Sequence, residues 1–281
     1  MKHPLDRTDI DNAWCPGCGN FGILKLIKEV LTELKCDPKN TVIVSGIGQA
    51  AKTPYYINTH MFCGLHGRAL PVSTALKASN PALNVIAEGG DGDMYGEGGN
   101  HFIHTIRRNP DIVHIVHNNM VYGLTKGQAS PTSQIGLKTP VQVEGVSNEP
   151  FNPISVALAL KAGFVSRVNI GNYDHAKTVL KEAFLHKGYA LVDVFQPCVV
   201  FNKVNTYRWF MDNTYELDSS YEKNSLSSAM HKALENDPIP IGIFYQDEHA
   251  TFEEHIWGNE KKPLVTHTHD IIKLQELFYS Y

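Results

Sequence analysis

Short apolar runs alternate with longer segments of helical periodicity over most of this chain, and the alternation limits the folds it can adopt. A strand, a helix and a second strand in succession form a right-handed unit with parallel strands in almost all proteins. Repetition of that unit produces a sheet with helices on both faces. We therefore predict a doubly wound α/β fold with a mainly parallel sheet. The expected strands are Thr41–Ser45, Asn84–Glu88, Asp111–Val116, Gly163–Val168 and Tyr189–Phe195, and the expected helices are Phe21–Lys35, Ser73–Ser79, Gly98–Arg108, Pro153–Ala162 and His175–His186.

The alternation weakens after residue 196, where aromatic and charged residues dominate. A chain of 281 residues is long for one compact domain and short for two full ones. We predict an α/β domain over residues 1–200 and a C-terminal extension over 201–281 that contacts a partner. A strand at Ile239–Tyr245 and a terminal helix at Asp270–Tyr279 are expected in the extension, and a loop at residues 59–68 in the domain.

The charge balance and the few cysteines restrict the partners and the compartment. The chain has 25 Lys and Arg residues against 29 Asp and Glu residues, a formal net charge of −4, so it lacks the basic field that nucleic acid requires. No apolar run approaches the ~18 residues of a membrane-spanning helix, and the opening segment has no apolar signal core. Five cysteines are too few for a secreted disulfide framework. We expect a cytoplasmic protein that binds neither nucleic acid nor membrane.

Two of the predicted strands end in polar residues of an unusual kind. Gly90-Asp91-Gly92-Asp93 follows one strand, and Asn118-Asn119 follows the next. In an open parallel sheet, ligands bind outside the carboxyl ends of the strands. Carboxylate and amide oxygens are ligands that Mg²⁺ prefers, together with substrate phosphate oxygens. Either motif alone is most often a turn, but the two motifs one strand apart predict a site for Mg²⁺ and a phosphorylated ligand.

The pair of motifs resembles the thiamine diphosphate motif, in which Gly-Asp-Gly is followed one helix and one strand later by Asn-Asn. The resemblance implies a diphosphate domain of the thiamine diphosphate-binding type. It also implies that the Asp91 and Asn119 side chains hold Mg²⁺ with the Val121 carbonyl, and that Gly92 and Asp93 contact the diphosphate.

A wider set of segments, from about residue 10 to about residue 210, resembles the β subunit of the 2-oxoacid:ferredoxin oxidoreductases, the pyruvate and 2-oxoglutarate synthase group. These segments are Trp14-Cys15-Pro16-Gly17-Cys18-Gly19-Asn20, Ser45-Gly46-Ile47-Gly48, Leu65-His66-Gly67-Arg68, Gly90-Asp91-Gly92-Asp93, Gly99-Asn100-His101-Phe102 and Tyr122-Gly123-Leu124-Thr125-Lys126-Gly127-Gln128-Ala129-Ser130-Pro131-Thr132.

This second resemblance assigns further residues to the site. Lys126, beside the substrate carboxylate or coenzyme A, and His66 would be the catalytic side chains. Taken alone, Lys126 is equally a solvated surface cation and His66 a structural loop residue. The resemblance implies that the cofactor is lined by Ile47, Gly48, Gln49, Ala50, His66, Gly123 and Leu124.

The resemblance also implies an activity and a set of partners. The family oxidatively decarboxylates a 2-oxoacid such as pyruvate or 2-oxoglutarate to acyl-coenzyme A and CO₂ and passes the electrons to ferredoxin. Thiamine enzymes pair a diphosphate domain with a pyrimidine domain, whose glutamate activates the cofactor, and only the diphosphate half is recognisable here. We expect a separate α subunit to supply the other half and the isolated chain to be inactive.

Cys15 and Cys18 form a C-x-x-C pair, which suggests metal or redox chemistry in a reducing compartment. Members of the family with a [4Fe-4S] cluster in this subunit use four cysteines, and those matching Cys15, Cys18 and Cys198 are present. The fourth position is Gln49, a poor ligand for iron in a sulfide cluster. Three readings stay open: Cys63 replaces the fourth ligand, three thiolates hold a labile cluster, or no cluster forms and the thiols are free or bind zinc.

Competing interpretations come from other residues. Gly46-Ile47-Gly48-Gln49-Ala50-Ala51 imitates a dinucleotide-binding fingerprint, but no acid follows before Glu88 and Pro54 interrupts the helix that the fingerprint should open. A split-subunit non-oxidative thiamine diphosphate-dependent decarboxylase and a non-catalytic metal or electron-carrier subunit are the two alternative functions. We expect four further histidines to be packing or surface residues, namely His101, His104, His114 and His117.

Overall fold

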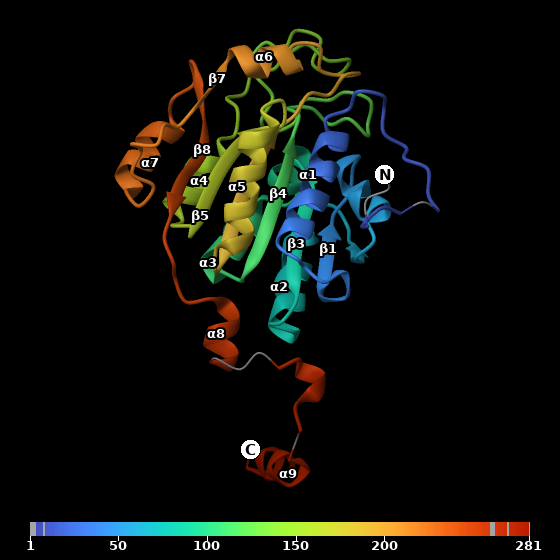
Figure 1. Ribbon diagram of the computed structural model, residues 1–281, viewed down its shortest axis with the longest axis vertical. Coiled ribbons are helices and arrows are strands. Elements are labelled where there is room, and N and C mark those ends of the chain that lie inside the picture. Colours follow the sequence, from blue (N-terminus) through green and yellow to red (C-terminus); the bar gives the residue numbers. More distant parts are fainter. Residues whose placement is uncertain (1–3, 8, 259–261, 269, 281) are drawn as a thin grey trace.

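The computed structural model describes residues 4–7, 9–258, 262–268 and 270–280. Within these residues, eight strands form one sheet in the order β2-β1-β3-β4-β6-β5-β8-β7 (Figure 1). The strands from β2 to β5 in this order are parallel, whereas β8 runs antiparallel to β5 and β7 runs parallel to β8. The bounds are β1 Thr41–Ser45, β2 His60–Cys63, β3 Asn84–Gly90, β4 Ile112–Asn118, β5 Phe164–Asn169, β6 Tyr189–Phe195, β7 Thr214–Glu216 and β8 Ile239–Gln246.

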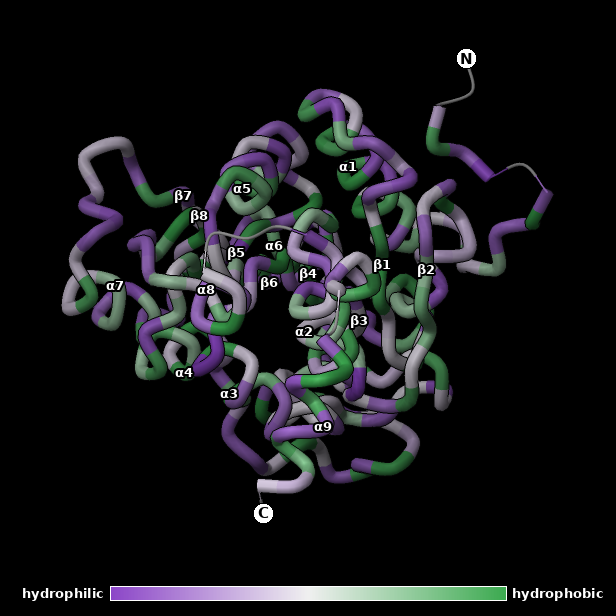
Figure 2. The backbone as a smooth tube through the Cα atoms, turned by 90° about the horizontal axis from the view of Figure 1, so that it is seen from below, coloured by the Kyte–Doolittle hydropathy of each residue, from purple (hydrophilic) through white to green (hydrophobic). Residues whose placement is uncertain are grey.

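Helices cover both faces of the sheet, because neighbouring strand residues point to opposite sides. In β1, Ile43 packs in the cluster of α1 (Asn20–Glu33) and α5 (Tyr173–Leu185). Val42 and Val44 pack in the other cluster, with helices of the opposite layer. The view from below shows the strands between the two layers (Figure 2). The opposite layer contains α2 Ala69–Ser79, α3 Gly99–Arg108, α4 Pro153–Ala159 and α7 Leu226–Ala233.

The doubly wound, mainly parallel α/β fold predicted from the sequence is confirmed. Thr41–Ser45 and Tyr189–Phe195 are strands with the predicted bounds. The expected loop at 59–68 was partly wrong, because His60–Cys63 forms β2 beside β1. All four β2 residues are exposed, so this strand lacks the apolar pattern by which the others were recognised.

Some residues beyond 200 form further strands of the same sheet, and others form helices away from it. The strand expected at Ile239–Tyr245 is β8, which pairs with β5. The helix α7 was missed in the sequence. The expected terminal helix is α9 (Ile271–Tyr279), which stands apart from the body at the bottom of Figure 1, beyond α8 (Phe252–Trp257). The division of the chain at residue 200 stays a prediction.

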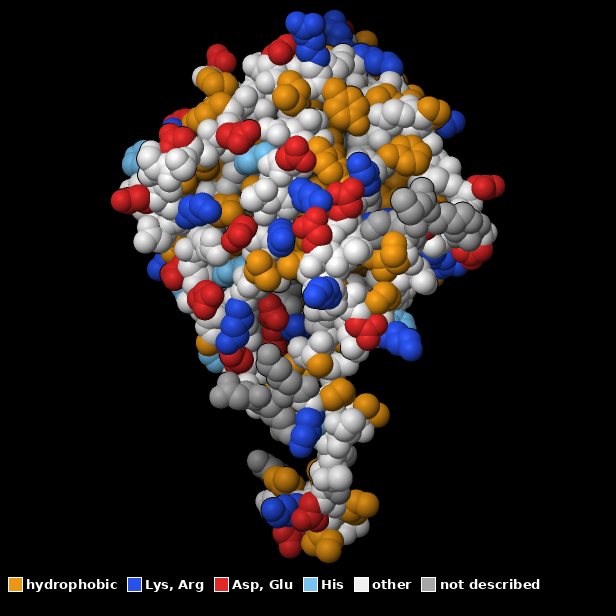
Figure 3. Space-filling model, viewed as in Figure 1, with side chains coloured by type: hydrophobic (Ala, Val, Ile, Leu, Met, Phe, Trp, Pro, Cys, Tyr) orange, Lys and Arg blue, Asp and Glu red, His pale blue; other side chains and the backbone are white. Residues whose placement is uncertain are grey.

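Acidic and basic side chains are intermingled on the face that carries α1 and α5 (Figure 3). There Lys177 Nζ lies 2.9 Å from Glu29 Oε2 and 2.6 Å from Glu33 Oε1, and so links the two helices. Screening by solvent makes such partly exposed pairs weak contributors to stability. Among the described helices, none combines the length and the apolar character needed to cross a bilayer.

Candidate active site

Asp91 follows the last residue of β3 and is the N-terminal cap of a short π-helix, η3 (Gly92–Glu97). Its carboxyl group is buried, and burial raises its pKa to about 6, against the effect of hydrogen bonds from Ser130 and Thr132. Thr132 Oγ1 lies 2.6 Å from Asp91 Oδ2. A buried carboxylate without a cation is unfavourable, so this position suits a ligand that brings positive charge.

Asn119 and Val121 lie at the carboxyl end of the neighbouring strand, β4, and face the same space as Asp91. The backbone N–H of Val121 donates to Asn119 Oδ1 over 3.0 Å, and Met120 between them has a φ of 57°. This turn carries the chain sharply away from the sheet edge. The two strand ends singled out in the sequence therefore lie side by side.

One cavity of about 90 Å³ joins the two strand ends to the loop after β1. Of the residues predicted to be catalytic, to bind the cofactor or to hold Mg²⁺, Lys126 lies outside the described lining of this cavity. Its side chain is exposed, two residues beyond Leu124, and its φ is 69°. His66 borders the cavity and is exposed on its other side. The predicted residues in the lining are Ile47, Gly48, Gln49, Ala50, His66, Asp91, Gly92, Asp93, Asn119, Val121, Gly123 and Leu124.

Asp93 holds the loops that border this cavity. Its Oδ1 accepts hydrogen bonds from the backbone N–H groups of Ile47, over 3.2 Å, and of Gly67, over 2.7 Å. Burial raises the pKa of this carboxyl group, and the two backbone donors oppose that shift. Asp93 Oδ2 is buried and has no hydrogen-bond partner among the residues that the structure describes. Asp93 therefore joins three segments of the chain around the cavity.

Gly92 needs to be a glycine because of Tyr122. A Cβ atom on Gly92 would lie 2.2 Å from Cε1 of the Tyr122 ring, which is closer than real Cβ contacts. The Tyr122 hydroxyl donates to the Gly92 carbonyl over 3.2 Å. The close approach lets the segment after β4 pack directly on η3.

A second cavity, of about 60 Å³, lies next to the first. Cys15, Cys18 and Cys198 all line it, although 180 residues of sequence separate Cys18 from Cys198. Burial raises the pKa of the Cys18 thiol to about 11, with smaller contributions from Cys198 and Cys15. The backbone N–H of Phe201 lies 3.4 Å from Cys198 Sγ. Three residues line both cavities, namely Gln49, Asn119 and Gly123.

Comparisons with known proteins agree with this geometry. Residues 40–194 match the family described as thiamine pyrophosphate enzyme, C-terminal TPP binding domain, and residues 198–261 match the C-terminal family of the pyruvate ferredoxin oxidoreductase beta subunit. A 2-oxoacid:ferredoxin oxidoreductase subunit beta from Sulfolobus sp is 44% identical over 88% of this chain and 86% of its own length. The chain belongs to the 2-oxoacid:ferredoxin oxidoreductase β-subunit family.

Further relatives of this family are also similar to the chain. The 2-oxoglutarate oxidoreductase subunit KorB of Mycobacterium tuberculosis is 43% identical over 84% of this chain and 60% of its own length. A solved 2-oxoglutarate:ferredoxin oxidoreductase from Magnetococcus marinus, with 2-oxoglutarate, coenzyme A and succinyl-CoA bound, superimposes with a TM-score of 0.91 at 31% identity. That match covers 97% of this chain and 94% of the solved one. The resemblance inferred from the sequence motifs is confirmed.

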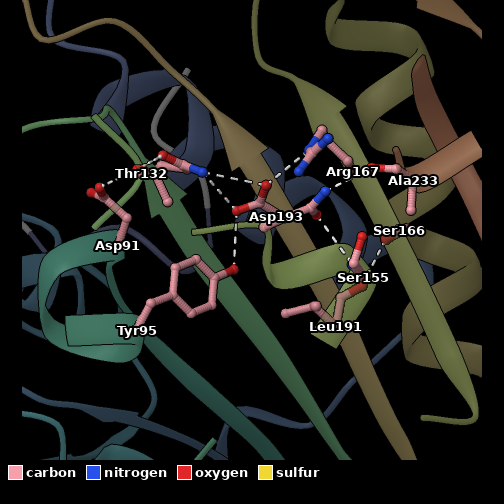
Figure 4. Close-up of polar contacts among 11 residues, drawn as sticks. Asp91, Tyr95, Thr132, Ser155, Ser166, Arg167, Leu191, Asp193 and Ala233 are labelled. Atoms are coloured by element: carbon pink, nitrogen blue, oxygen red, sulfur yellow. Dashed lines mark hydrogen bonds and ion pairs between the residues drawn. The ribbon is translucent and has the colours of Figure 1, made fainter. Parts of the chain in front are cut away.

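A buried polar network, which no sequence motif indicated, lies behind Asp91 (Figure 4). Thr132 Oγ1 lies 2.8 Å from Asn118 Oδ1, and Asn118 Nδ2 donates to Asp193 Oδ1 over 3.1 Å. Asp193 also accepts from the Tyr95 hydroxyl, over 3.0 Å, and from Arg167 Nε, over 3.0 Å. The sequence did contain one signal of this network, since each of two apolar strands includes a charged residue. These residues are Arg167 in β5 and Asp193 in β6.

The second cavity, lined by Cys15, Cys18 and Cys198, is called the three-thiol cavity below. The two remaining cysteines do not belong to its described lining. Cys63 is exposed at the end of β2, where it raises the pKa of Tyr55, whereas Cys36 packs against the core on the α1 face. The structure thus gives no support to the reading in which Cys63 replaces the fourth cysteine. Across the described ranges, no three His, Cys, Asp or Glu side chains are arranged to hold a single metal ion.

The histidines of β4 are buried on opposite faces of the sheet, as strand geometry requires. His114 Nδ1 lies 2.6 Å from the Tyr189 hydroxyl, and burial lowers its pKa to about 3. His117 Nε2 lies 2.6 Å from Glu88 Oε1, and its Nδ1 lies 2.9 Å from Asn20 Oδ1. Both histidines are packed in the core of the chain and lie outside the described lining of the cavity that joins the two strand ends.

Proposed function

We propose that the chain is the thiamine diphosphate-binding subunit of an enzyme that decarboxylates a 2-oxoacid oxidatively, with coenzyme A as acyl acceptor and ferredoxin as electron acceptor. The observation that carries the proposal is the single cavity that joins the ends of β3 and β4 to the loop after β1. The substrates named for the relatives, including 2-oxoglutarate, support a 2-oxoacid as the substrate here.

A magnesium ion fits between the end of β3 and the turn that follows β4. Asp91 is a buried carboxylate, and the negative charge of Asp193 raises its pKa further. A bound Mg²⁺ would relieve this unfavourable burial and would supply positive charge for a diphosphate. In our proposal the Asp91 and Asn119 side chains and the Val121 carbonyl hold the ion. The backbone at Gly92 approaches the diphosphate, and Asp93 keeps the Ile47 and Gly67 loops in place around it.

The remaining lining residues would position the rest of the cofactor. Bound thiamine diphosphate supplies the carbanion stabilisation that decarboxylation needs. Gly48, Ala50 and Leu124 would exclude water from it, and His66 would face it from the exposed side. Lys126 is exposed beside the cavity. It would bind either coenzyme A or the carboxylate of the substrate, at the point where a partner subunit completes the site.

The cavity of the three thiols favours an oxidative reaction over a non-oxidative decarboxylase. An iron–sulfur cluster would fit there, because a cluster is wider than a single ion and its thiolates need not converge on one point. A single zinc ion fits less well, since it needs ligands within about 2.3 Å of one centre. We propose that Cys15, Cys18 and Cys198 would hold a cluster, which would supply one-electron chemistry beside the first cavity. The two cavities share Gln49, Asn119 and Gly123 in their linings.

The proposal includes an α subunit with the pyrimidine domain. The exposed apolar side chains of α9, a helix standing off the body, support a partner contact by residues 201–281 (Figure 1). They are Ile271, Ile272, Leu274, Leu277, Phe278 and Tyr279. A cytoplasmic location, supported by the five free cysteines, remains part of the proposal.

An anaerobic assay of the co-purified complex tests the function. Viologen reduction would be followed with a panel of 2-oxoacids, with and without coenzyme A. Coenzyme A-dependent reduction is expected, and the best 2-oxoacid identifies the substrate. Aldehyde release without viologen reduction would transfer the function to a non-oxidative decarboxylase. Failure of the complex to bind thiamine diphosphate with Mg²⁺ would favour the non-catalytic carrier instead.

A further inference from the structure

The three-thiol cavity has a side that carries no thiol. Cys15 and Cys18 lie at one turn, in which the Cys18 N–H donates to the Cys15 carbonyl over 3.0 Å. Cys198 approaches from the segment after β6. The side formed by the loop after β1 is occupied by Gln49.

Gln49 is held in this place by its own backbone. The Trp14 indole Nε1 donates to the Gln49 carbonyl over 2.7 Å, and Trp14 is itself buried next to Cys15. The side-chain oxygen of Gln49, Oε1, is buried and has no hydrogen-bond partner in the described part of the chain. A buried amide oxygen without a partner is costly, so it calls for a donor or a cation in the cavity.

The other two amide side chains in the described lining of this cavity, Asn20 and Asn119, have oxygens that are already engaged. Asn20 Oδ1 lies 2.9 Å from His117 Nδ1, and Asn119 Oδ1 accepts the Val121 N–H over 3.0 Å. An amide oxygen is a hard ligand, whereas iron in a sulfide cluster prefers thiolate. Gln49 can therefore lie against an iron atom but binds it far more weakly than a cysteine would.

We infer that the cluster in this chain has one iron without a protein thiolate, that this iron faces Gln49, and that it is exchangeable. The inference rests on the proposed function, which assigns a cluster to the cavity. One-electron oxidation would then release that iron, with atoms and charge balanced as [4Fe-4S]²⁺ → [3Fe-4S]⁺ + Fe²⁺ + e⁻. A one-electron oxidant such as ferricyanide accepts the electron. The open iron would also accept a small exogenous thiolate or cyanide.

The test uses the complex purified without oxygen, as wild type, Gln49→Cys and Cys63→Ser. Each form is treated with one equivalent of ferricyanide, desalted, and examined by iron and sulfide analysis and by electron paramagnetic resonance. Wild type and Cys63→Ser, which changes a thiol outside the cavity lining, are expected to lose one iron in four and to gain the signal of a three-iron cluster. Gln49→Cys is expected to keep all its iron and to show no signal of a three-iron cluster in electron paramagnetic resonance.

A second measurement works without any variant. Oxidised wild type is reduced and supplied with ⁵⁷Fe²⁺, and Mössbauer spectra are expected to show the label in a single iron site. Label spread over all sites, or retention of all iron by the oxidised wild type, would overturn the inference while leaving the cluster in place. Absence of iron and sulfide from a complex that still binds thiamine diphosphate would instead overturn the cluster itself.

Discussion

Thr132 Oγ1 lies 2.6 Å from Asp91 Oδ2, so a hydroxyl from the loop after β4 contacts the carboxylate at the end of β3. The same oxygen lies 2.8 Å from Asn118 Oδ1. A hydroxyl has one hydrogen, so Thr132 donates to one of these acceptors at a time. Thr132 thereby positions Asp91 relative to the sheet.

Substitution of Thr132 by Val is expected to weaken Mg²⁺-dependent binding of thiamine diphosphate. A lost hydrogen bond of this kind costs about 1 kcal/mol, a roughly fivefold change in affinity. Thr132→Ser keeps the hydroxyl and should bind the cofactor as the wild type does. Calorimetric titration of the complex with cofactor at saturating Mg²⁺ measures the difference. Equal affinities for the Val and Ser variants would refute a positioning role.

Asp91→Ala is expected to abolish Mg²⁺-dependent cofactor binding while the fold stays intact. The change removes a proposed ligand and also a buried carboxyl group that burial disfavours, so stability should not fall. Asp212→Ala, which removes an exposed carboxylate on α6 (Tyr207–Asp212), is the matched control. Circular dichroism and calorimetry on both variants separate folding from binding. If Asp91→Ala bound the cofactor with wild-type affinity, Asp91 would not be a ligand of Mg²⁺.

Gly92→Ala is expected to destabilise the chain, because the new methyl group would lie 2.2 Å from the Tyr122 ring. Overpacking of this kind costs about 1–3 kcal/mol. Gly99→Ala is the control, since a Cβ there would meet no atom within 4 Å. Urea unfolding of the three proteins gives the free energies. The double variant Gly92→Ala/Tyr122→Ala should recover part of the loss if the clash is its cause.

Acid is expected to destabilise the fold through His114. Burial lowers its pKa to about 3 in the folded chain, against about 6.5 when unfolded. Between these values the unfolded state binds the extra proton, so the stability present above pH 6.5 falls by about 1.4 kcal/mol per pH unit as the pH drops. Because the loss begins only below pH 6.5, urea unfolding at pH 7.5 and pH 5.5 should give free energies that differ by about 1.4 kcal/mol through this residue. His114→Gln should reduce this pH dependence. An unchanged slope in the variant would assign the acid sensitivity to other groups, such as His175 and His186, whose pKa values burial also lowers.

The sequence predicted those parts of the fold and site that depend on local pattern. The strand Thr41–Ser45 is bounded by its apolar run, and Asp91 and Asn119 meet because both follow parallel neighbours in the sheet. The exposed strand β2 has no such pattern and is fixed by pairing with β1. Thr132 and Asp193 could not be found in this way, since only tertiary packing brings a loop and a distant strand to Asp91.

The wall between the two cavities, formed by Gln49, Asn119 and Gly123, belongs to both linings. A substitution on this wall therefore changes the lining of both cavities at once. The shape of one cavity is coupled to the shape of the other. In the proposed enzyme, electrons would cross this wall, so the residues that would bind the cofactor would also separate it from the cluster. Engineering a new substrate or a new redox partner into this chain would have to begin elsewhere, at the open rim around His66 and Lys126.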